Sequence, residues 1–399
     1  MIATRVLRRS CSCGVTLASV VAMLCVWDQA HAACNVPGVG NVTIDLKSIE
    51  FTSDHEDGNG DNILLANNTD WTDDGTAYGE PEWVSGVDNN PISHTRNSKL
   101  TVKITISVSP ANLTFDLEGD GPNNYVDFHK NGNTSTGADQ EITVTADGNL
   151  PGAVCILTES INWKINVNGT ECNAGSSGEH TIYVTWGTPA PSSDLTHKRI
   201  EWCTTVPFDT DTPSELALEI ANKVNVDVVL GNGNTWPTPY SGNIWPALEK
   251  TEANKVDCLQ SAALAVDALK LLGYPSADVE TGMAWPSSDT NVDTEEPTKS
   301  CPTHGTLCLR YEVENGGYLN NYEGYFKINY SSSWHYYTTW ADWLQVTGPH
   351  SSSYDLLDYI RDQAEADSAM DFGQYWSYPY TGTLRYKDPD TWPDEVTLP

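Results

Sequence analysis

Basic residues are scarce in this sequence of 399 residues. Lysine and arginine together number 21, against 54 aspartate and glutamate residues, and the formal net charge is −33. Nucleic acids and anionic membrane surfaces are bound by positively charged patches. The charge balance therefore opposes nucleic acid as a partner, and it is compatible with divalent cations.

The signature motifs of several enzyme classes are also missing. The chain contains no P-loop for nucleotide phosphates, no HExxH zinc motif and no CxxC pair. Its hydrophobic fraction of 39% is nevertheless ordinary, so we expect a folded protein rather than a disordered one. None of these features indicates a required cofactor.

Long apolar runs are confined to the N-terminus. Arg5, Arg8 and Arg9 precede an apolar stretch over 11–27, and small residues flank His31 at the two positions that a signal peptidase reads. We predict a signal peptide over residues 1–32, with an uncleaved N-terminal anchor as the alternative. Because no later run is long enough to cross a bilayer, we expect a protein that is secreted or held at the cell surface or in the periplasm, without a membrane span after cleavage.

Seven cysteines follow the predicted signal peptide. Exported proteins tend to pair their cysteines, and an odd number leaves at least one thiol unpaired or intermolecular. Cys155 and Cys172 flank a predicted strand and could form a disulfide, and Cys301 and Cys308 could staple one loop. The seven are Cys34, Cys155, Cys172, Cys203, Cys258, Cys301 and Cys308.

Alternation of apolar and polar residues predicts β-strands throughout the N-terminal half. The clearest runs are 100–108, 161–167 and 182–186. A further run over 42–51 changes phase at Ser48, which predicts a bulge or two short strands. Weaker strands are expected at 63–65, 115–117 and 142–144.

About seven strands without a convincing helix are typical of an immunoglobulin-like β-sandwich. We assign residues 33–188 to such a domain. Residues 189–198 begin with two closely spaced prolines and are predicted to be a linker.

In the C-terminal part, 199–399, helical patterns appear ahead of a run of predicted strands. This order predicts an α+β domain. Residues 212–215 form a capping box with proline at the first helical position, which predicts a helix over 213–225. The strongest helical pattern begins at Cys258 and ends before Gly273. The elements expected after it are strands at 307–313, 318–328 and 334–340 and a helix at 354–370.

Cys258 has a distinctive setting at the first turn of its predicted helix. Free backbone N–H groups and the helix dipole stabilise a thiolate there and lower the thiol pKa. A thiolate is a competent nucleophile when a histidine and an orienting polar group converge on it. If six of the seven cysteines pair, we expect Cys258 to be the unpaired one. The alternative is an ordinary buried helix residue or a disulfide partner.

The segment from Val256 to Val279 resembles the core motif of the transglutaminase-like superfamily, which is similar in architecture to papain-like proteases. A cysteine opens an amphipathic helix that leaves through Gly273-Tyr274-Pro275 into a strand. The resemblance implies a papain-like α+β domain, for which immunoglobulin-like domains are common neighbours. It also implies a nucleophilic Cys258, a histidine near the start of the next core strand, and an aspartate on the following one.

The sequence departs from this family at the histidine position. Asn320 and Asn321 stand there, and asparagine cannot accept the thiol proton. His335, with Asp342 a few residues later, is the first candidate replacement, and His304 is the next. Without either histidine the site would be inactive or repurposed.

A weaker pattern indicates calcium. Asp57, Asn59 and Asp61 offer oxygen ligands at alternate positions, as in the first half of a calcium loop. A correctly spaced downstream acid is missing, so a solvated loop rich in Asp, Asn and Gly is the alternative.

Two functions remain open at this stage. The first is an exported transglutaminase-like protein whose Cys258 hydrolyses or transfers the acyl group of a protein or peptide amide. The second is a non-catalytic surface protein that uses a degenerate form of the fold to bind protein or carbohydrate, including a cell-surface polymer.

Overall fold

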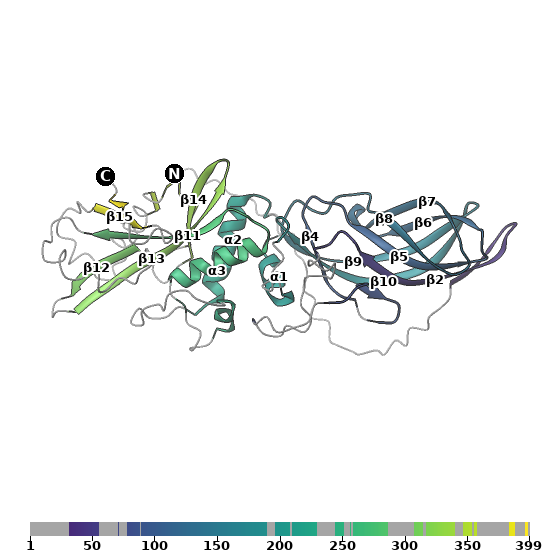
Figure 1. The fold of residues 1–399 in the computed structure, drawn as a ribbon, viewed down its shortest axis with the longest axis horizontal. Coiled ribbons are helices and arrows are strands. Elements are labelled where there is room, and N and C mark those ends of the chain that lie inside the picture. Colours follow the sequence, from purple (N-terminus) through teal and green to yellow (C-terminus); the bar gives the residue numbers. More distant parts are fainter. Residues whose placement is uncertain are drawn as a thin grey trace, which may run out of the picture. The chain divides into compact units, whose positions relative to one another are not determined.

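The structure of the 399-residue chain is a computed structural model, and its elements are labelled in Figure 1. For residues 32, 258–259, 278–285, 307–313, 317–324, 383–387 and 396–397 only the backbone is described. The described residues are 32–55, 71, 78–87, 89–189, 196–207, 210–229, 244–250, 256, 258–285, 307–313, 317–339, 346–352, 355–356, 383–387 and 396–397.

Two five-stranded sheets form the N-terminal part of the described chain. The first sheet has the order β1 (Ala32–Val36), β2 (Gly40–Phe51), β5 (Thr101–Ser109) and β8 (Asp139–Thr145), with β3 (Trp83–Val84) paired to β2. The second has the order β4 (Ile92–Thr95), β10 (Thr170–Thr185), β9 (Cys155–Val167), β6 (Thr114–Asp120) and β7 (Phe128–Thr134).

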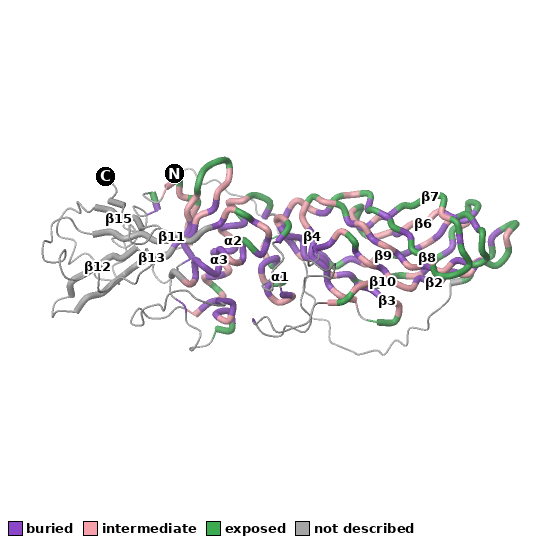
Figure 2. Tube along the Cα trace, viewed as in Figure 1, coloured by how far each residue is buried: buried purple, intermediate pink, exposed green. Residues whose placement is uncertain are grey.

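The sheets share one hydrophobic core because their strands alternate in burial. Along β5, buried Val102, Ile104, Ile106 and Val108 are separated by partly exposed residues, as Figure 2 shows for the strands generally. These side chains lie in one cluster with residues of β9 and β10, including the fully buried Trp163. The alternation predicted from the sequence is therefore confirmed, and so is the irregularity in β2, where the register with β5 shifts between Leu46 and Ser48.

In the described part of the chain the next elements are the α-helices α1 (His197–Thr204), α2 (Pro213–Asp227) and α3 (Cys258–Leu271). Thr212 and Glu215 form the predicted capping box at the start of α2. Short 3₁₀ turns are η1 (Asn124–Val126) and η2 (Trp245–Glu249). No helix among the described residues is long and apolar enough to cross a membrane.

A third sheet follows the helices. Its order is β14 (Ser333–Thr338), β13 (Gly317–Tyr330), β12 (Leu307–Val313), β11 (Ala277–Trp285), β15 (Thr383–Lys387) and β16 (Val396–Thr397), and β11 also pairs with β13. The chain is thus a mixed α+β protein. Within the predicted helix 354–370, only residues 355 and 356 are described, and both are helical.

Polar contacts join the second sheet to the helices. His197 at the start of α1 is hydrogen-bonded to the hydroxyls of Tyr78 (2.9 Å) and Tyr183 (2.7 Å). The guanidinium of Arg96 lies 3.1 Å from the ring centre of Trp186 and donates to the Asp211 carbonyl at 2.8 Å. Tyr183 also belongs to the same buried cluster as the helices.

Candidate functional site

Cys258 is the first residue of α3, as the sequence predicts. Alanine and leucine fill the following turns and are buried, so hydrophobic packing holds the helix in place. Gly273 ends it in the left-handed conformation (φ +77°), and the Tyr274 N–H donates to the Leu269 carbonyl. The side chain of Cys258 itself lies outside the described residues.

Strands β11, β13 and β14 form the part of the sheet that packs against α3, and their register decides which side chains contact the helix. Phe326 and Ile328 of β13 are opposite Val279 and Ala277 of β11. On the other side of β13, Phe326 is opposite Tyr337 of β14. Phe326, Ile328 and Tyr337 are fully buried in one cluster with the apolar residues of α3.

His335 lies at the end of this sheet where α3 finishes. It is opposite Ile328, and its ring stacks on Tyr330 with centroids 3.7 Å apart and planes 13° apart. The hydroxyl of Tyr274, three residues after α3, donates to the carbonyl of Asn329 at 2.7 Å. His335 therefore lies near the C-terminal end of α3.

The first turn of α3 is distant from that end. At a rise of 1.5 Å per residue, Cys258 lies about 20 Å along the helix axis from Leu271. The Nε2 atom of His335 is buried and has no hydrogen-bond partner within the described part of the chain. A thiol–imidazole pair between Cys258 and His335 stays a prediction. It is not favoured by the strand pairing, which holds His335 near the opposite end of α3 from Cys258.

The other predicted site residues are only partly described. Asn320 and Asn321 lie in β13 opposite Arg310 and Leu309, and their side chains lie outside the described residues. Also outside are His304, Asp342, Asp57, Asn59 and Asp61.

The predicted Cys155–Cys172 disulfide is wrong. Cys172 is bonded to Cys34, and Cys155 and Cys203 are free and buried. The register explains this, because Cys155 is opposite Val184 whereas Cys172 is opposite Ile165. Ten strand residues, about 33 Å, separate these two positions on β9. Because the thiols of Cys155 and Cys203 are both free, the condition that six cysteines pair is not met, and the unpaired state of Cys258 stays a prediction.

Cys155 and Cys203 are not suited to nucleophilic chemistry. Burial raises the pKa of the Cys155 thiol to about 12, and it also raises that of Cys203, which is fully enclosed. A thiol must ionise to act as a nucleophile. These two residues are therefore structural.

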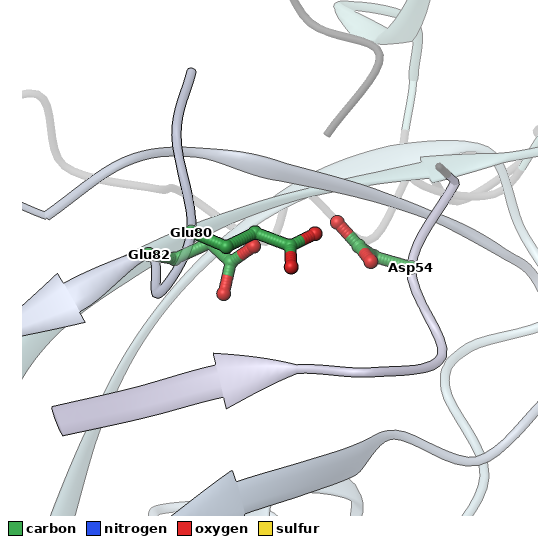
Figure 3. A group of neighbouring side chains, drawn as sticks. All are labelled: Asp54, Glu80 and Glu82. Atoms are coloured by element: carbon green, nitrogen blue, oxygen red, sulfur yellow. The ribbon is translucent and has the colours of Figure 1, made fainter. Parts of the chain in front are cut away.

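An acidic cluster, Asp54, Glu80 and Glu82, lies beside the first sheet (Figure 3). Asp54 follows β2, and Glu82 immediately precedes β3, which pairs with β2 through Ile49 and Trp83. One carboxylate oxygen from each acid lies within 4.8 Å of those of the other two. This spacing suits the ligands of a single metal ion.

The carboxyl group of Glu82 is the most deeply buried of the three, with 1% of the residue exposed. Its Oε2 accepts a hydrogen bond from the Phe51 N–H at 2.8 Å, and its Oε1 has no hydrogen-bond partner among the described residues. Burial raises its pKa to about 7, against the opposing effect of the Phe51 N–H.

Sequence reasoning missed this acidic cluster. Glu80 and Glu82 follow Asp54 by more than twenty residues and match no ligand pattern. The pairing of β2 with β3 brings the two segments together. The nearest predicted pattern was the calcium-like one that begins at Asp57, three residues after Asp54.

Comparison of the sequence with models of known protein families and with curated protein sequences finds no match.

Proposed function

We propose that this chain is an exported surface protein in which an immunoglobulin-like domain carries a transglutaminase-like domain that binds a partner without amide chemistry. The observation that carries this proposal is the grouping of His335 with the end of α3, about 20 Å along the helix axis from Cys258. Hydrogen-bond reach for a general base is near 3 Å.

Strand order supports the immunoglobulin-like part. The order β2–β5–β8 in one sheet and β10–β9–β6 in the other follows strands A–B–E and G–F–C of immunoglobulin domains. The Cys34–Cys172 disulfide joins β1 to β10, unlike the B–F disulfide of antibody domains. A disulfide also fits an exported protein.

Element order supports the transglutaminase-like part. A helix that begins at a cysteine leads through Gly-Tyr-Pro into β11, which pairs antiparallel with β13, and β13 pairs with β14. This is the sequence of elements that the family resemblance implies. Asn320 and Asn321 lie near the start of β13, where the family resemblance implies a histidine.

A thiol-dependent amide hydrolase or acyl transferase is the second candidate. It is favoured by the position of Cys258 as the first residue of α3, where the helix dipole stabilises a thiolate. His304 or His335 would then have to reach the thiol.

Alkylation of the folded chain separates the two candidates. For a non-catalytic site, we expect the rate of iodoacetamide labelling of Cys258, measured by mass spectrometry across pH, to follow a single thiol ionisation. The profile should be unchanged in His335→Ala and His304→Ala. Cys155 and Cys203 serve as internal controls, because their burial should prevent labelling until the chain unfolds.

If the protein is a catalyst, an acyl-transfer assay on the same purified chain should detect it. A burst of about one equivalent of p-nitrophenol from p-nitrophenyl acetate, lost in Cys258→Ser, would indicate an acyl-enzyme. Together with a pH profile that changes in either histidine variant, this burst would overturn the non-catalytic proposal. Sedimentation with peptidoglycan and with insoluble polysaccharides measures binding, which we expect Cys258→Ser to retain.

A further inference from the structure

The geometry of the acidic cluster matches one bound cation. Calcium holds its oxygen ligands at about 2.3–2.6 Å, so two ligands of one ion can be at most about 5 Å apart. The ligand atoms of Asp54, Glu80 and Glu82 all lie within 4.8 Å of one another. Figure 3 shows the three side chains approaching from two separate segments, with their carboxyl groups adjacent.

Burial also favours a positive group beside Glu82. Asp54 is 8% exposed and Glu82 is 1% exposed, so water solvates neither carboxylate well. An ionised carboxylate in such a site is costly unless it is paired or bound to a metal. The Oε1 atom of Glu82 has no hydrogen-bond partner among the described residues and is available as a ligand.

Two basic side chains lie near the cluster. Lys103 forms an ion pair with Glu50 at 2.6 Å, and its hydrogen bond to Glu50 together with the charges of Glu50 and Glu80 raises its pKa. Both ring nitrogens of His55 are hydrogen-bonded to hydroxyls, those of Ser93 (3.0 Å) and Thr95 (3.1 Å).

We propose that Asp54, Glu80 and Glu82 bind one calcium ion, which fastens the segment after β2 to the segment before β3. Calcium suits the site better than magnesium, because magnesium needs ligands at about 2.1 Å and retains several waters. An acidic chain with a formal net charge of −33 also attracts cations in general. This site is distinct from the pattern at Asp57, Asn59 and Asp61.

Thermal unfolding of the purified full chain tests the proposal. We expect calcium at about 1 mM, a typical working concentration for extracellular modules, to raise the Tm relative to EDTA, with one ion bound per chain by calorimetry. Glu82→Gln should abolish this rise. Glu141→Gln, which removes an exposed charge from β8 of the same sheet, should retain it.

A spectroscopic measurement keeps the test independent of stability. Trp83 adjoins Glu82, so terbium bound in place of calcium should luminesce when tryptophan is excited. Calcium should quench this signal by competition, and Glu82→Gln should lose the signal while keeping a cooperative unfolding transition in EDTA. Equal calcium shifts in Glu82→Gln and the unmodified chain, or the lack of one-to-one binding at up to about 10 mM calcium, would overturn the proposal.

Discussion

At the scale of single residues, burial decides which titratable side chains can react. Cys155 and Cys203 are enclosed and have raised pKa values, whereas Cys258 opens a helix. The sequence could predict the setting of Cys258, because a helix start is a local pattern. It could not predict that Cys34 pairs with Cys172, since 138 residues separate the two.

His180 should make the stability of the protein depend on pH. It is 1% exposed, its Nε2 lies 2.7 Å from the Ser177 hydroxyl, and burial lowers its pKa from about 6.5 to about 4. Between these values the unfolded chain binds a proton that the folded chain does not. Stability is therefore lost as the pH falls from about 6.5 to about 4, by at most about 3 kcal/mol.

Denaturant unfolding at several pH values measures this effect. We expect His180→Gln to have a smaller change in the free energy of unfolding between pH 4 and pH 6.5, whatever its stability at neutral pH. His129→Gln is the control, because His129 is exposed beside Asp147. Parallel curves for His180→Gln and the unmodified chain would contradict the assignment.

At the scale of elements, local patterns predicted those helices and strands that bury one regular face. The helix predicted at 213–225 is α2, and the strand predicted at 100–108 is β5. The strand β7 was missed because it lies at a sheet edge and most of its side chains are exposed, which removes the alternation. Helix α1 was missed because it begins directly after the proline- and serine-rich stretch.

Two glycines pack backbone to backbone where α3 ends. Gly273 has φ +77°, and a Cβ atom on Gly273 would lie 2.3 Å from the Gly187 carbonyl oxygen. The Gly187 N–H donates to the Leu272 carbonyl at 3.0 Å. Gly273→Ala should therefore combine backbone strain with a steric clash and cost roughly 3 kcal/mol or more.

A variant at Gly169 separates the effect of backbone strain from that of the steric clash. Gly169 has a similar φ of +81°, with no atom within 4 Å of an added Cβ. We expect Gly169→Ala to cost only about 1 kcal/mol, from strain alone. Urea unfolding gives both values, and equal losses for the two variants would exclude the close contact with Gly187.

At the scale of the whole molecule, covalent and packing contacts join segments that are remote in sequence. Cys34 lies on β1 of the first sheet and Cys172 on β10 of the second. Val154 and Tyr183, from the N-terminal part, share a buried cluster with residues of α2 and α3.

Removing the disulfide should destabilise the fold substantially. Opening a loop that spans 138 residues restores chain entropy to the unfolded state, worth about 4–5 kcal/mol at most. We expect Cys34→Ser/Cys172→Ser to lower the Tm and the midpoint of urea unfolding. Reductant should lower the Tm of the unmodified chain and leave that of the double variant unchanged. An unchanged Tm in the double variant would contradict the prediction.

The sequence by itself determined the acidic character of the chain, the alternating strands of its N-terminal half, helices α2 and α3, and Cys258 as the first residue of α3. Each of these depends on composition or on neighbours a few residues apart. Only the tertiary structure decided the disulfide partner of Cys172, the grouping of His335 with the end of α3, and the meeting of Asp54 with Glu80 and Glu82. These depend on strand register and sheet order, which pairing between distant segments sets and no local pattern encodes.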